Sequence, residues 1–119
     1  MDNLKDIEIE DFDDHIVVYF YGDLSIKNIK DIDEVLNKEL NKDIDTIGIN
    51  CSYLNHVDSI SINHLVKFSK KASNKGIEII FFCLNDHIEN IFTTINLDKL
   101  VKISSKEQFD DFYIGKKFS

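Results

Sequence analysis

The sequence lacks patterns that several classes of protein require. It has no proline and four glycines among its 119 residues. The glycines are isolated from one another, at Gly22, Gly48, Gly76 and Gly115. Neither of the familiar glycine-rich loops that cradle phosphates can be built from them, which argues against a nucleotide site of those kinds.

Long apolar runs and an excess of basic residues are also absent. No apolar run approaches the roughly 20 residues of a membrane span. Asp and Glu number 22 against 14 Lys and Arg, a formal net charge of −8. That balance disfavours nucleic acid and anionic membrane surfaces, which attract basic faces. The acidic N-terminus MDNLKDIEIED has no apolar signal core, so we expect no export and a cytoplasmic location.

Metal-binding and redox patterns are missing too. The two cysteines, Cys51 and Cys83, form no CxxC motif and lie in expected strands, so we interpret them as buried reduced thiols. The histidines are scattered along the chain: His15, His56, His64 and His87. His56 and His64 are eight residues apart across the expected strand-to-helix turn, with no cysteine or carboxylate at ligand spacing, so we expect no metal site and no cofactor.

What the sequence does contain is an alternation of strand-like and helix-like segments. Runs of β-branched, aromatic or alternating apolar residues predict strands at 7–10, 15–22, 46–52, 77–84 and 100–104. Apolar stripes with helical spacing predict helices over 29–40, 62–73 and 88–95. Ser25 or Asn28 is expected to cap the first helix, and Gly76 to end the second. A last helix follows the capping-box spacing of Ser105 and Gln108.

The resulting order is β-β-α-β-α-β-α-β-α, which predicts an α/β fold with a mixed, mostly parallel sheet. The first strand is expected to be antiparallel, because the acidic turn at 11–14 is too short for a crossover. The run at 77–84 is the most apolar and is expected to be the central strand. No linker or repeat divides the chain, so we expect one domain over residues 1–119.

The segment VDSISI at 57–62 lies where a predicted strand gives way to a predicted helix. Partners and ligands of parallel sheets meet the carboxyl ends of the strands. Asp58 or Ser59 is expected to cap the helix, with Ser59 at the cap position, and this structural role alone would explain both residues. A phosphate on Ser59 would meet the positive end of the helix dipole and add nearly two negative charges. The pattern therefore also suits a phosphorylation switch.

Ile60 lies almost opposite the apolar stripe of the same helix, with His64 beside it. The stripe is assigned to Ile62, Leu65, Val66, Ser69, Ala72 and Ser73, with Phe68 on its flank. An isoleucine in this position is either covered by the preceding loop or offered to a partner. Beside a candidate phosphoserine, it forms a plausible contact patch.

Three stretches together resemble a STAS domain, the fold of bacterial anti-sigma-factor antagonists. They are VVYFYGDL, then TIGINCSYLNHVDSISINHLVKFSKKASNKGIEIIFFCL, then IENIFTTINLDKLVKISSKEQF. The resemblance implies a parallel sheet with successive strands adjacent, which would bring Cys51 and Cys83 onto neighbouring strands. It also implies that Ser59, preceded by Asp58, is the phospho-acceptor. The sequence departs from the family's D-S-S-G by having Ile60 and Ser61, and it has Ser25 where the family often has aspartate.

The resemblance predicts an anti-sigma-factor antagonist rather than an enzyme, with no catalytic residue. Its partners would be an anti-sigma factor that is a serine kinase, and a serine phosphatase. The expected contact face around Ser59 comprises Asp23, Ser25, Asn55, His56, Asp58, Ile60, Ser61 and His64. The alternative is a STAS scaffold or transporter-complex subunit that binds proteins without phosphorylation. A small hydrolase would need an apolar pocket with polar groups converging near Asp58 and His56.

Overall fold

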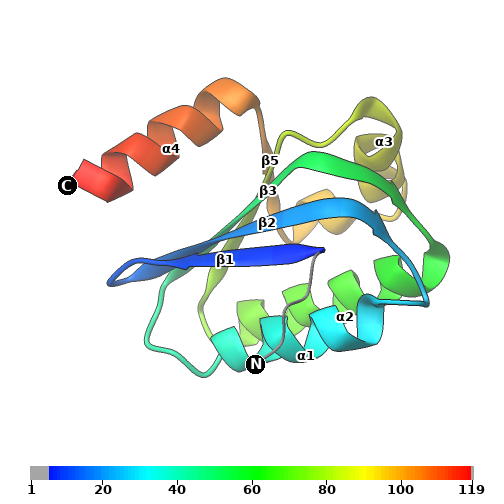
Figure 1. The fold of residues 1–119 in the computed structure, drawn as a ribbon, viewed down its shortest axis with the longest axis horizontal. Helices are drawn as coiled ribbons and strands as arrows, with labels where there is room; N and C mark the ends of the chain where they lie inside the picture. The colour runs from blue at the N-terminus through cyan, green and yellow to red at the C-terminus, as the bar shows by residue number, and fades with distance from the viewer. Residues whose placement is uncertain (1–5, 119) are drawn as a thin grey trace.

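The computed structural model describes residues 6–118, and the side chains of residues 6–113. Figure 1 shows a twisted sheet with helices on both sides. The strands are β1 (Ile7–Asp11), β2 (His15–Leu24), β3 (Thr46–Val57), β4 (Glu78–Phe82) and β5 (Lys102–Ser104). The helices are α1 (Ile29–Glu39), α2 (Ser59–Asn74), α3 (Asp86–Thr94) and α4 (Lys106–Phe118), with a short 3-10 helix, η1 (Leu97–Lys99).

The strands lie in the order β1-β2-β3-β4-β5. β1 is antiparallel to β2, and the other neighbouring pairs are parallel. The expected fold class and order of elements are confirmed. The central strand is β3 rather than the run at 77–84, because each crossover helix delivers the next strand to the adjacent position.

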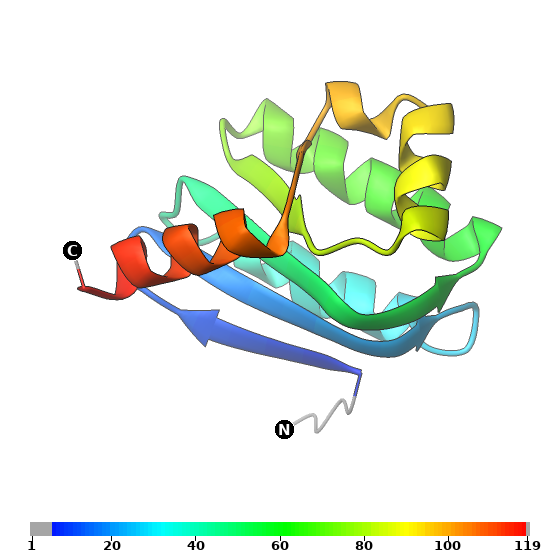
Figure 2. The same ribbon diagram turned by 90° about the horizontal axis from the view of Figure 1, so that it is seen from above.

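One face of the sheet carries the larger hydrophobic core. α1, α2 and α3 contribute to it through buried residues such as Leu36, Leu65 and Phe92. Figure 2 shows α4 on the opposite face from α1 and α2. There Phe109 packs with Val17 and Phe82 in a second, smaller core. No helix within residues 6–118 is long and apolar enough to cross a membrane.

Gly48 in β3 permits the close approach of α4. A Cβ atom at this position would lie 2.8 Å from the Phe112 ring and 3.2 Å from the Phe82 ring. Phe112 also contacts His15 edge to face, with ring centroids 5.7 Å apart. The helix therefore seats its aromatic side chains directly on the backbone of the central strand.

The ends of β3 and β4 differ from the prediction for identifiable reasons. β3 continues beyond residue 52 to Val57, because β2 extends beside it through Leu24, with two irregularities in the pairing. β4 ends at Phe82, because Cys83 has a left-handed backbone with φ of 65°. Cys83 therefore follows β4 and is half-buried, whereas Cys51 is buried within the neighbouring β3. Burial raises the pKa of the Cys51 thiol, which keeps it protonated.

The helix ends follow local rules. Gly76 takes a left-handed φ of 75° just after α2, as expected. Ser105 and Gln108 form the reciprocal capping box before α4, with bonds of 2.9 and 3.2 Å. Asn28 is the N-cap residue of α1, but its side chain makes no capping bond to the helix.

Candidate functional site

The site lies at the carboxyl edge of the sheet, where β2 and β3 end side by side. Leu24 and Val57 are paired at the ends of the two strands. The Asp58 amide donates a 3.1 Å hydrogen bond to the Leu24 carbonyl. This pairing fixes the start of α2 against the loop that leads from β2 to α1.

Asp58 is the residue that joins these two segments. It is the N-cap of α2, and its Oδ1 accepts a 2.8 Å bond from the Ser61 amide. Its Oδ2 accepts a 2.9 Å bond from the Ile26 amide in the β2–α1 loop. These backbone donors, the Ser61 amide first, lower the pKa of the Asp58 carboxyl below its ordinary value. Of the two expected caps, Asp58 is the one that forms, and Ser59 is instead the first residue of the helix.

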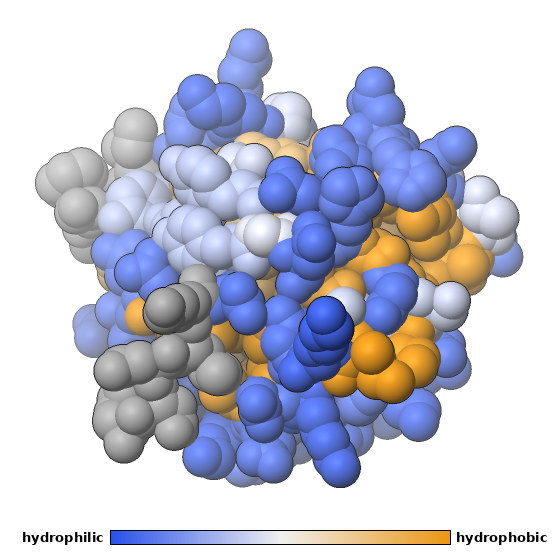
Figure 3. Space-filling model, turned by 45° about the vertical axis from the view of Figure 1, so that its right-hand side comes forward, coloured by the Kyte–Doolittle hydropathy of each residue, from blue (hydrophilic) through white to orange (hydrophobic). Residues whose placement is uncertain are grey.

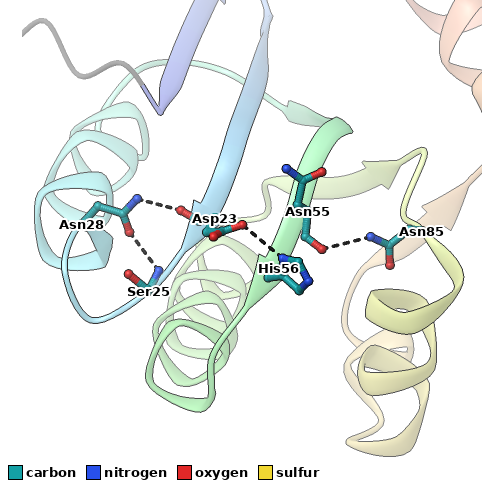
Figure 4. Close-up of polar contacts among 6 residues, drawn as sticks. All are labelled: Asp23, Ser25, Asn28, Asn55, His56 and Asn85. Carbon is teal, nitrogen blue, oxygen red and sulfur yellow. Dashed lines mark hydrogen bonds and ion pairs between the residues drawn. The ribbon is translucent and has the colours of Figure 1, made fainter.

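The β2–α1 loop is held in shape by Asn28. Its Oδ1 accepts a 2.9 Å bond from the Ser25 amide, and its Nδ2 donates a 2.8 Å bond to the Asp23 carbonyl (Figure 4). Ser25 adds a turn of its own, since its Oγ accepts a 3.2 Å bond from the Lys27 amide. The sequence marked Asn28 only as a possible helix cap. Its position just after a glycine-ended strand was the available signal for a role in the loop.

Two further predicted residues meet on the strand extensions. His56 on β3 and Asp23 on β2 are exposed, and His56 Nδ1 lies 3.3 Å from Asp23 Oδ1. Asn55 contributes its carbonyl, which accepts a 3.2 Å bond from Asn85 Nδ2 (Figure 4). Asn85 was not predicted; it caps α3 through a 2.9 Å bond to the Ile88 amide. The extension of β3 thus ties α3 to the same edge.

Ser59 lies on this edge, at the first position of α2. Its side chain is exposed and makes no hydrogen bond within residues 6–113. Two exposed isoleucines are close by: Ile60, the next residue, is 43% exposed, and Ile26, whose amide donates to Asp58, is 65% exposed. Figure 3 turns this side of the molecule forward and shows hydrophobic surface among hydrophilic side chains. The prediction that Ile60 points away from the core is confirmed, and Ile26 is an apolar neighbour that the sequence pattern missed.

Ser61 was wrongly placed on the contact face. It is fully buried, and its Oγ has no hydrogen-bond partner of acceptable geometry in the described part of the chain. The buried face of α2 is rotated from the assigned stripe toward Phe68, which is 1% exposed, and away from Ser73, which is exposed. Ser61 shares that face because it lies one and two turns before Leu65 and Phe68.

His64 lies at the edge of the expected contact face. Its Nδ1 is 3.0 Å from Asp33 Oδ2 on α1, and its side chain is 31% exposed. It therefore connects α1 to α2 and offers only part of its surface to a partner. The cluster that the structure brings together comprises Asp23, Ser25, Ile26, Asn55, His56, Asp58, Ser59 and Ile60, and is called the Ser59 face below.

The chemistry of the Ser59 face suits recognition. It combines an unbonded hydroxyl, two exposed isoleucines and the carboxylates of Asp23 and Asp58. Within the described residues, no three or more His, Cys, Asp and Glu side chains are grouped so that they could hold a metal ion. A phosphate on Ser59 would add negative charge near the carboxylates of Asp23 and Asp58. It would also compete with Asp58 for the amides at the start of α2, because the Ser61 amide already donates to Asp58.

Comparison with known proteins agrees with this architecture. The family model for the STAS domain matches residues 6–109. A Thermotoga maritima protein, provisionally named an anti-sigma factor antagonist, is 30% identical over 96 residues, which cover 76% of this chain and 81% of that protein. A crystal structure under that name from the same organism superposes with a TM-score of 0.78 at 25% identity, over 88% of this chain and 92% of the other.

The Bacillus cell fate determinant SpoIIAA, solved in its phosphorylated form, has the same fold. Its TM-score is 0.72 at 15% identity, over 90% of this chain and 98% of SpoIIAA. The family match spans nearly the whole length of the sheet and its helices. The chain therefore belongs to the STAS domain family and groups with its anti-sigma factor antagonists.

Proposed function

We propose that this protein is an anti-sigma-factor antagonist that works by partner switching. With Ser59 unmodified, the Ser59 face binds an anti-sigma factor that is also a serine kinase. Phosphorylation of Ser59 by that kinase releases the complex, and a serine phosphatase restores the binding form. The protein acts in the cytoplasm, through protein contacts and without catalysis of its own.

The observation that carries the proposal is the setting of Ser59. Its hydroxyl is exposed and unbonded within residues 6–113, at the first position of a helix whose next residue is the exposed Ile60. Apolar side chains provide contact area that a partner can bury. Two nearby carboxylates, Asp23 and Asp58, mean that an added phosphate concentrates negative charge where the partner must dock.

Phosphorylation of purified protein tests the modification. The chain is incubated with ATP and each candidate serine kinase of its organism that binds it, and the phosphate is mapped by mass spectrometry. The expected result is one phosphate on Ser59 and none in the Ser59→Ala variant. Ser52→Ala, which removes another exposed hydroxyl, is the matched control and should remain phosphorylated. No phosphate on Ser59 with any binding kinase would contradict the switch.

The second candidate is a STAS scaffold or transporter-complex subunit without a phosphorylation cycle. The exposed apolar pair of Ile26 and Ile60 favours it, since such a surface suits a constitutive contact. Capture of a stable complex whose affinity is the same for wild type and Ser59→Asp would support this reading. A complex that Ser59→Asp dissociates would support partner switching.

A further inference from the structure

A groove lies between α2 and residues 95–100, which run from the end of α3 through η1. Figure 2 shows α3 and η1 next to α2. The groove is a hollow of about 330 Å³, with neighbouring hollows of about 190 and 440 Å³. In order of size, the first and second share Ile95, and the second and third share Lys99 and Leu100. The middle hollow is therefore a neighbour of the other two, and none of the three is lined by a residue of the Ser59 face.

The middle hollow has the composition of a small-molecule site. Its lining is Val66, Lys70, Ile95, Asn96, Leu97, Lys99 and Leu100. Four of these residues are apolar, two are cationic and none carries a carboxylate. Small-ligand pockets are typically apolar, with a few polar groups that fix orientation, and measure about 300–1,000 Å³.

The backbone at Asn96 gives this wall its shape. Asn96 has a left-handed φ of 62°, which turns the chain sharply after α3. Leu97 enters the core and is 3% exposed, whereas Ile95 stays outside at 43%. Ile95 thus lines both the first and the middle hollow, whereas the exposed Ile26 and Ile60 line none of the three.

The two lysines of the middle hollow are available to a ligand. Among residues 6–113, neither Lys70 nor Lys99 forms an ion pair, whereas Lys102 in the third hollow is 2.8 Å from Glu78. The third hollow also contains Asp98. An anion is therefore favoured in the middle hollow, on a molecule whose formal net charge is otherwise −8.

We propose that this groove binds a carboxylate with an apolar chain, in chemical class a medium-chain fatty acid. Lys70 and Lys99 hold the carboxylate, and the chain lies on Val66, Ile95, Leu97 and Leu100. The proposal does not depend on Ser59 or on any protein partner, so it can fail while the proposed function stands.

The experiment is an NMR titration of the ¹⁵N-labelled protein with octanoate, 1-octanol and octylammonium. Octanoate is expected to shift the amide signals of Ile95, Leu97 and Leu100 with a roughly millimolar Kd, as suits a ligand of this size. Octylammonium should bind at least about tenfold more weakly, because its charge opposes the lysines. Equal binding of all three, or no shifts with octanoate, would overturn the proposal.

Variants separate the head-group contact from the apolar wall. The double variant Lys70→Gln, Lys99→Gln should weaken octanoate at least about fivefold and leave octanol unchanged. Lys67→Gln removes an exposed α2 lysine that does not line the groove, and should leave octanoate binding as in wild type. If the double variant binds octanoate as tightly as wild type, the assignment of the carboxylate to Lys70 and Lys99 is wrong.

Discussion

Asp58 organises the candidate site more directly than Ser59 does. One carboxylate accepts amides from α2 and from the β2–α1 loop, and so sets the positions of Ile26 and Ser61 relative to each other. Asp58→Asn retains an acceptor but removes the charge. Asp58 therefore fixes the start of α2, where the exposed hydroxyl of Ser59 lies.

The charge of Asp58 predicts a pH dependence of stability. Its pKa is lowered in the folded protein from an ordinary value of 3.8, because backbone amides favour the ionised form. The ionised Asp58 therefore contributes fully to the free energy of unfolding above the pKa that it has in the unfolded chain. This contribution is lost as the pH falls through the lower pKa that it has in the folded protein. Urea unfolding at pH 7, 5 and 3 should show wild type more stable than Asp58→Asn by a constant amount at the two higher values. The difference should shrink at pH 3; a difference that grows at pH 3 would show the opposite sign.

Asn85 offers a second test at a single residue. Asn85→Ala removes both the α3 cap and the donor to the Asn55 carbonyl, and should lower the free energy of unfolding by about 1 kcal/mol. Asn85→Asp keeps the cap acceptor and should cost less. Asn90→Ala, an exposed change inside the same helix, is the control for urea unfolding. Equal losses for Asn85→Ala and Asn90→Ala would show that the cap is unimportant.

Among the elements, the helices and the order of strands and helices along the chain were predictable from their apolar patterns, whereas the pattern alone placed the wrong strand at the centre of the sheet. The extension of β3 over Tyr53–Val57 was not predictable, since its polar residues form a strand only because β2 lies beside them. Ser61 was misplaced for a related reason. Val66 and Ser73 fit the helical period nearly as well as Phe68, and only the packed core shows which face α2 buries.

The face of the sheet on which α4 packs could not be predicted from the sequence either. Phe109 and Phe112 predicted a helix, but its place on the opposite face follows from Gly48, whose missing side chain admits the Phe112 ring. Phe109→Ala should lower the free energy of unfolding by about 3 kcal/mol, since the ring is buried between Val17 and Phe82.

Hydrogen exchange measured by mass spectrometry distinguishes local from global effects of Phe109→Ala. The α4 amides should exchange faster, while α1 and α2, which pack on the other face, retain their protection. Asp110→Ala, an exposed change in the same helix, is the control. Unchanged exchange in α4 would mean that Phe109 does not hold the helix to the sheet.

For the molecule as a whole, the structure separates two surfaces, the Ser59 face and the α2–α3 groove. Ile60→Asp should abolish binding of the anti-sigma factor and leave octanoate binding intact, and Ile95→Asp should do the reverse. Both changes are at exposed positions and should alter the free energy of unfolding by no more than about 0.5 kcal/mol. Calorimetric titration of each variant with each ligand checks this. Loss of both activities in either variant would contradict the separation.

The order of the elements predicts the fold. The quoted stretches indicate the family, and the segment 57–62 places Ser59 at the start of α2. Ile26 and Asn85 do not follow from the sequence, because their roles depend on contacts between segments far apart in the chain. Net charge adds a further constraint at this scale. A chain of formal net charge −8 attracts a basic partner, and a phosphate on Ser59 would place further negative charge on a face that already holds Asp23 and Asp58.

The affinity of the anti-sigma factor for the unmodified and the Ser59-phosphorylated protein is the most direct test of partner switching. Both forms are titrated by calorimetry after the phosphate has been mapped to Ser59. The account predicts tight binding of the unmodified form and a loss of at least about 100-fold on phosphorylation, because a phosphate beside Asp23 and Asp58 in a partly apolar interface is costly to desolvate and is repelled by those carboxylates. Equal affinities for the two forms would contradict it.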